Sequence, residues 1–133
     1  MITQRTEYLL LTLLDLARVE GNQHVLSRDV AERQGIPAKY MPQLMAILTR
    51  KGWVNSVRGA GGGVRLAVDP KDVTVQDVIE VSGDPLLVKG CASPAADCPQ
   101  KPTCPLHPLW ARAQASIDEV MRGATLADLM KSS

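Results

Sequence analysis

The chain has 133 residues, enough for one domain with an appended arm, and its net charge is only +1. No apolar run reaches the roughly 18 residues that a membrane span requires, and the first residues lack the layout of a signal peptide. We therefore expect a cytoplasmic protein with no membrane partner, whose reduced cysteines serve metal or redox chemistry rather than a disulfide scaffold.

The charge is unevenly distributed along the chain. Residues 1–66 contain nine Lys/Arg against five Asp/Glu, whereas residues 67–133 contain six against nine. A basic N-terminal half can face a polyanion while the acidic remainder stays solvated. Splits of this size also occur in proteins without such a partner, so charge alone does not decide the function.

Two helical segments open the chain. Residues 7–20 are apolar around most of the helix circumference, which is typical of a helix buried between neighbours. Ser27 is a suitable N-cap for a short helix that runs to Gln34. Gly35 follows directly and supplies the positive φ that a tight turn after this helix needs.

A third helix and a hairpin follow. Residues 38–51 are helix-forming, with Pro42 in the first turn because a proline deeper inside would break the hydrogen-bond ladder. Residues 53–57 and 64–68 are short and β-like, and the glycine-rich stretch 58–63 between them predicts a hairpin tip. Helix, turn, helix and hairpin in this order predict a winged helix-turn-helix.

Such a domain binds duplex DNA with the start of its recognition helix at base edges and its wing against the backbone. Gln43 can read adenine, and Lys39 can contact a guanine or a phosphate. The alternatives are a solvated surface for both side chains and a packing role for Tyr40. The candidate DNA-binding residues are Arg28, Ala38, Lys39, Tyr40, Gln43, Arg58, Gly59, Gly61, Gly62 and Arg65.

The C-terminal half begins with a capped helix and ends with a long one. Thr74 and Asp77 form an acidic variant of the capping box for a helix that ends at Ser82. His107 and Pro108 suit the N-cap and first position of a helix through residue 122. Its apolar positions make one stripe, formed by residues 109, 110, 113, 117, 120 and 121. A short tail helix, capped by a Thr-Asp pair at 125 and 128, follows.

All the cysteines lie in one proline-rich loop. Cys91, Cys98 and Cys104 fall within fourteen positions, and His107 follows the last of them. Three thiols cannot all pair within one chain, whereas three thiolates and an imidazole suit an iron–sulfur cluster. A structural zinc site fits the number of ligands but lacks the usual closely spaced cysteine pairs. A cluster-free thiol switch is the other alternative.

Several motifs resemble those of one family over essentially the whole chain. They are TEY at 6–8, RQGIP at 33–37, VRGAGGG at 57–63, the three-cysteine loop and TLADL at 125–129. Together they are similar to the Rrf2 family of bacterial transcription regulators. The resemblance implies a homodimer paired through the long helix, a palindromic DNA operator, and a 2Fe–2S or 4Fe–4S cluster whose presence or state sets DNA affinity. Family members sense cluster supply, iron, nitric oxide or redox state.

The resemblance implies two candidates for the fourth ligand beside the three cysteines. His107 matches the histidine of the iron–sulfur-biogenesis regulators. Glu7 lies where nitric-oxide-sensing and some redox-sensing members place a carboxylate ligand, in some cases from the partner subunit. Two features depart from the biogenesis regulators: the gap between Cys91 and Cys98 is one residue longer, and Pro42 replaces an acidic residue.

The expected fold is therefore mainly α with a small β-hairpin. A winged helix-turn-helix domain covers residues 1–83, a cysteine-rich cluster-binding loop covers 84–107, and a dimerisation helix with a tail covers 108–133. The expected function is DNA-binding transcriptional regulation controlled by a cluster. The alternatives are a thiol-switch or zinc-stabilised repressor, a module that binds protein, and a thiol- or cluster-dependent enzyme. No substrate pocket or base–nucleophile pair in the sequence supports the enzyme.

Overall fold

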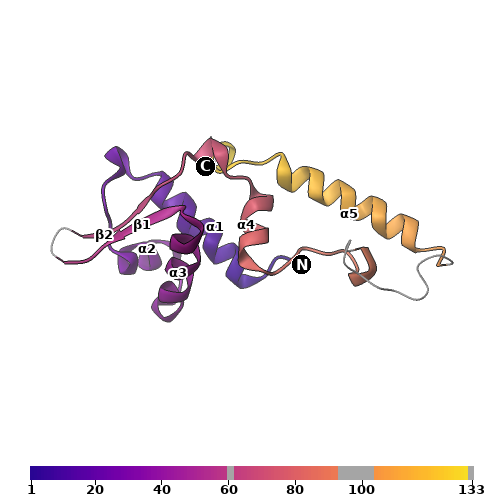
Figure 1. The fold of residues 1–133 in the computed structure, drawn as a ribbon, viewed down its shortest axis with the longest axis horizontal. Coiled ribbons are helices and arrows are strands. Elements are labelled where there is room, and N and C mark those ends of the chain that lie inside the picture. Colours follow the sequence, from indigo (N-terminus) through magenta and orange to yellow (C-terminus); the bar gives the residue numbers. More distant parts are fainter. Residues whose placement is uncertain (60–61, 93–103, 132–133) are drawn as a thin grey trace.

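A computed structural model describes residues 1–59, 62–92 and 104–131. Figure 1 shows a compact body from which one long helix projects. The helices and strands are α1 (Gln4–Ala17), α2 (Ser27–Gln34), α3 (Met41–Lys51), β1 (Val54–Val57), β2 (Gly63–Leu66), α4 (Val75–Ser82), α5 (His107–Arg122) and α6 (Leu126–Lys131). Mainly α with one hairpin, this order confirms the expected fold class. None of the helices described is both long enough and apolar enough to cross a membrane.

Helix α1 runs through the centre of the body, as its apolar circumference predicted. Leu9, Leu13 and Leu16 are at most 2% exposed, and they pack in one core with residues of α2, α3, the hairpin and α6. The helix begins three residues earlier than expected, because the side chain of Thr3 caps it by accepting a hydrogen bond from the Thr6 amide.

The helix-turn-helix forms with one local correction. Gly35 adopts a φ of 68° at the end of α2, as predicted. Ser27 is the first residue of α2 rather than its N-cap, and Leu26 is the N-cap without a side-chain hydrogen bond. The cause is tertiary, because Val25 exchanges two backbone hydrogen bonds of 2.7 and 2.8 Å with Val64 and keeps the chain extended up to Leu26.

The recognition helix and the hairpin form close to their predicted positions. Residues 38–40 form a 3₁₀ turn that leads into α3, with Pro42 in the first turn of the helix. The two strands pair antiparallel with Val54 opposite Leu66. β1 begins one residue later than predicted, and β2 begins one residue earlier and ends two residues earlier. Val54, Val64 and Leu66 turn into the core, and the hairpin is thereby fixed to α1 and α3.

The C-terminal elements leave the body after α4 and return to it at α6. The predicted capping box of Thr74 and Asp77 is present at the start of α4. The chain before α6 pairs with the chain before α4 through a Thr74–Thr125 bridge, and Leu126 is fully buried. His107 is the first residue of α5 rather than its N-cap; Leu106 is the N-cap, without a side-chain hydrogen bond.

A buried carboxylate joins the C-terminal half of α1 to α2. Asp15 is 6% exposed, and it accepts hydrogen bonds of 2.7 and 3.0 Å from Arg33 and of 2.9 Å from Gln34. Burial raises the pKa of Asp15, but the hydrogen bonds from Arg33 and Gln34 outweigh it, so the pKa lies below its ordinary value. The bidentate pair therefore stabilises the fold while Asp15 is ionised.

Arg33→Met should lower the free energy of unfolding by about 2 kcal/mol at pH 7, because it leaves a buried carboxylate short of partners. The wild-type pair contributes stability above the unfolded-state pKa of Asp15, and this contribution is lost as pH falls through the lower folded-state pKa. Urea unfolding between pH 7 and pH 2 should show the two proteins converging at low pH. A constant difference over this range would contradict the ionic role.

Candidate functional site

The start of the recognition helix presents three of the expected DNA-binding side chains to solvent. Ala38, Lys39 and Gln43 are exposed, and Arg28 is exposed in the first turn of α2. Tyr40 is half-buried, and its ring lies 5.6 Å from that of Tyr8 on α1, measured between centroids. The packing alternative for Tyr40 is thus present in the structure.

The ring of Tyr40 also lies beneath the ammonium group of Lys39. The Nζ atom of Lys39 lies 5.2 Å from the centroid of the Tyr40 ring, a cation–π distance. Tyr8, Tyr40 and Gln43 line a cleft of about 290 Å³ between α1 and the start of α3. Tyr8 was missed as a contributor to this surface, because no local pattern relates residues 32 positions apart.

The two arginines of the wing differ in position and exposure. Arg58 is exposed directly after β1, and Gly59 adopts a φ of 94° at the turn. Arg65 lies further along β2, half-buried and opposite Asn55. Gly61 lies outside the described residues, so the expected wing contact is only partly described.

Gly62 fits its position because it has no side chain. A Cβ atom there would lie 2.2 Å from the carbonyl oxygen of Val57, and the Gly62 amide donates a 3.0 Å hydrogen bond to the carbonyl of Gly59. The turn that connects the two strands therefore excludes any other residue at this position without a shift of the backbone.

The cysteine segment is described at its two ends. Cys91 lies in a 3₁₀ turn (Gly90–Ala92), and Cys104 immediately precedes α5. Both are free, half-buried thiols. Cys98 lies outside the described residues, and the remaining part of the chain shows no three His, Cys, Asp or Glu side chains close enough to hold a metal ion.

The imidazole of His107 is available as a ligand. Its Nδ1 atom is buried and has no hydrogen-bond partner among the described residues. The backbone amide of His107 donates a 3.3 Å hydrogen bond to the carbonyl of Cys104, so one tight turn joins the last cysteine to the helix. A buried imidazole nitrogen without a partner is uncommon unless a ligand or water completes it.

Glu7 occupies a different part of the molecule. It is exposed in the first turn of α1, whereas His107 begins α5 at the outer end of the projecting helix (Figure 1). The structure does not bring these two candidate ligands together within one chain.

A polar cluster fixes the point where the chain leaves α4 for the cysteine segment. Asp84 accepts hydrogen bonds of 3.0 and 2.7 Å from Arg5 and of 2.8 Å from the Thr3 hydroxyl. Arg5 and then Thr3 lower the pKa of the Asp84 carboxyl. Thr6 adds a buried hydrogen bond of 2.8 Å to Ser82. Sequence reasoning missed this cluster, because its partners are 76 to 81 positions apart.

A helix-turn-helix followed by a hairpin wing, with a long helix leaving the body, defines a winged-helix DNA-binding regulator. The sequence matches a family model described as an iron-dependent transcriptional regulator, Rrf2, over residues 2–132. The chain therefore belongs to the Rrf2 family of transcriptional regulators, as its motifs predicted.

Named relatives and solved structures agree with this assignment. The HTH-type transcriptional regulator IscR of Vibrio atlanticus is 35% identical over 130 residues, which cover 98% of this chain and 75% of that protein. The structure of T. potens IscR is 34% identical with a TM-score of 0.75, covering 99% of this chain and 87% of that one. CymR, the global cysteine regulator of B. subtilis, is 28% identical with a TM-score of 0.79, covering 100% of this chain and 98% of that one. These relatives are regulators rather than enzymes, in agreement with the expectation for this chain.

Gly62→Ala should lower the free energy of unfolding by about 1–3 kcal/mol, because the new methyl group forces the turn of the wing out of its present conformation. Gly90→Ala is the matched control, since a Cβ atom there meets nothing within 4 Å. Urea denaturation of the two variants measures the difference. Equal stability of both variants would show that the turn relaxes without strain.

Proposed function

We propose that this Rrf2-family regulator binds a palindromic duplex in the cytoplasm as a homodimer, and that an iron–sulfur cluster sets its DNA affinity. The cluster would be held by Cys91, Cys98 and Cys104, with His107 as the fourth ligand. The observation that carries the proposal is the buried Nδ1 atom of His107, which has no hydrogen-bond partner among the described residues and lies one turn after a free cysteine.

The donor chemistry of the described residues fits such a group. Thiolates are the usual ligands of iron–sulfur clusters, and imidazole replaces thiolate in some of them. Cys91 and Cys104 are both free and half-buried, so neither needs a disulfide to be broken before it ligates. When bound, the cluster would supply a redox-active centre that joins the two ends of the segment between α4 and α5.

Glu7 is the less suitable ligand from the same chain. It is exposed at the start of α1, remote from the first turn of α5 (Figure 1). Glu7 would therefore serve as a ligand only if it came from the other subunit of the dimer. His107 needs no contribution from the partner subunit, because it belongs to the same turn as Cys104.

The exposed stripe of α5 supports the proposed dimer. Leu109 is 50% exposed and Val120 is 65% exposed, and on a helix of 3.6 residues per turn they lie on one face with Ala113. An apolar stripe of this kind on a projecting helix is stabilised when a second copy covers it. A symmetric dimer also presents its two wings to the two halves of a palindrome.

A cluster-free thiol switch is the second candidate, because Cys91 and Cys104 are free thiols and a structural relative is named as a cysteine regulator. Its chemistry would be a disulfide between two of the three cysteines, formed with loss of two electrons to an oxidant. Iron analysis separates the two candidates directly, since the switch needs no metal.

Protein purified without oxygen should be coloured and contain iron and acid-labile sulfide, and both should be lost in each single Cys→Ala variant. His107→Ala should weaken cluster retention. Glu7→Gln, which changes both subunits of the homodimer, should do so only if Glu7 of one subunit is a ligand in the other. Visible absorption during exposure to a chelator measures retention. Colourless, iron-free protein whose DNA binding responds to a thiol oxidant would instead establish the thiol switch.

Arg58→Ala should weaken binding to specific and nonspecific duplexes alike and reduce the slope of log K against log salt by about 1, as expected for the loss of one phosphate contact. Lys71→Ala is the charge-matched control, because Lys71 is exposed in a 3₁₀ turn outside the helix-turn-helix and the wing. Fluorescence anisotropy at several salt concentrations measures both slopes. Equal slopes for Arg58→Ala and wild type would exclude the wing contact.

A further inference from the structure

A glutamine on α5 holds the chain that leads to Cys91. Gln114 is 6% exposed. Every residue of α5 is described, and Gln114 is the one that is buried. Its Oε1 atom accepts a 2.8 Å hydrogen bond from the amide of Val88, and its Nε2 atom donates a 2.8 Å hydrogen bond to the carbonyl of Leu86. One side chain thus binds two backbone groups of the segment.

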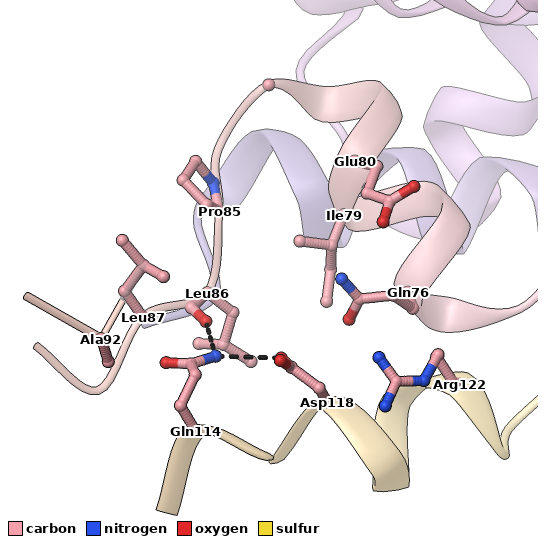
Figure 2. A pocket seen from close by; sticks show the side chains of 11 residues that line it. Gln76, Ile79, Glu80, Pro85, Leu86, Leu87, Ala92, Gln114, Asp118 and Arg122 are labelled. Atoms are coloured by element: carbon pink, nitrogen blue, oxygen red, sulfur yellow. Dashed lines mark hydrogen bonds between the residues drawn. The ribbon is translucent and has the colours of Figure 1, made fainter. Parts of the chain in front are cut away.

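The orientation of this amide is fixed by a third partner. Nε2 also donates a 2.9 Å hydrogen bond to Asp118, one turn further along α5. Figure 2 shows Gln114 between Leu86 and Asp118, with both bonds of its nitrogen drawn. A flipped amide would place its oxygen against the Leu86 carbonyl and the Asp118 carboxylate, and its NH₂ group against the Val88 amide. The observed orientation satisfies all three partners at once.

The position of Gln114 relates it to the candidate ligands. It lies seven residues after His107 on the same helix, and because 3.6 residues make one turn, the two side chains share a face about 10 Å apart along the axis. Val88 is three residues before Cys91. One face of α5 therefore carries the imidazole of His107 in its first turn and, two turns later, the Gln114 side chain that binds the chain leading to Cys91.

We propose that Gln114 is a positioning residue that docks residues 86–88 on α5 and thereby places Cys91 relative to Cys104 and His107 before a cluster is bound. The consequence for the cluster rests on the proposed function, whereas the docking itself does not. Holding both ends of a loop in advance lowers the entropy lost when the loop closes around a ligand. Asp118 contributes by setting the orientation of the Gln114 amide.

The first test uses metal-free, reduced protein. Gln114→Leu removes all three hydrogen bonds at similar volume, so the Val88 amide should exchange with deuterium at least about tenfold faster and Cys91 should be alkylated faster. Gln76→Leu is the matched control, because Gln76 on α4 and Gln114 line one cleft of about 420 Å³, and the side chain of Gln76 makes no hydrogen bond with the described residues. Unchanged exchange at Val88 and unchanged alkylation of Cys91 in Gln114→Leu would overturn the proposal.

The second test is a rescue that remains informative if the leucine variant folds poorly. Gln114→Glu keeps an acceptor for Val88 but sets a carboxylate against Asp118, so Val88 protection should fall. Adding Asp118→Asn replaces this repulsion with a hydrogen bond and should restore part of the protection, because the carboxylate at position 114 still faces the Leu86 carbonyl. A double variant no better protected than Gln114→Glu alone would refute the assigned role of Asp118 and, with it, the proposed geometry.

The third test links docking to the cluster. Anaerobically reconstituted Gln114→Leu should lose iron to a chelator several-fold faster than wild type and Gln76→Leu, with an altered visible circular dichroism spectrum. Wild-type retention in Gln114→Leu would overturn the positioning role even if the segment is undocked. If wild-type protein takes up no cluster, the proposed function fails, and the exchange and alkylation measurements still decide whether Gln114 docks the segment.

Discussion

The burial of α1 is the constraint on which the rest of the structure depends. Its leucines fill the centre of the core, and its two ends carry polar contacts that orient the neighbouring elements. Asp15 near the C-terminal end holds α2 through Arg33, and Arg5 near the N-terminal end holds Asp84. Because one rigid helix makes all these contacts, the DNA-reading helices and the start of the cysteine segment share a single frame.

The start of the cysteine segment and the start of the recognition helix both contact the N-terminal half of α1. Arg5 and Tyr8 are one turn apart on α1; Arg5 grips Asp84, and Tyr8 packs on Tyr40 at the start of α3. A cluster can shift the balance between two arrangements of the protein only by binding one of them more tightly. Asp84 and Tyr40 are connected by only two side chains of α1, Arg5 and Tyr8, which also line one cleft with them.

Local features could be predicted from the sequence, because their causes lie within a few residues. The capping box of Thr74 and Asp77, the turn at Gly35 and the early position of Pro42 each follow from backbone chemistry that acts over one turn of helix. The family motifs likewise predicted the winged fold, since they mark the turns and the glycine-rich tip that define it.

The features that failed or were missed depend on contacts between distant segments. Ser27 does not cap α2, because the backbone pairing of Val25 with Val64 determines where that helix begins. Gln114 in a helix sequence is indistinguishable from a solvated surface residue until the chain at 86–88 is seen beside it. The ligand set stays a prediction from residue type, because Cys98 lies outside the described residues. No spacing rule gives the fold of the segment that carries it.

Helix α5 has an exposed apolar face and a separate polar face that binds residues 86–88. Leu109, Ala113 and Val120 lie on one face, while His107 and Gln114 lie on a face rotated by well over 90° from it, given 100° per residue. The first face is apolar and exposed, and the second binds the segment that leads to Cys91. A dimer formed through the apolar face therefore leaves the cysteine face uncovered by the partner helix. The polar contacts at Gln114 and Asp84 lie within one chain, so in the proposed dimer they could change without loss of the apolar contacts between subunits.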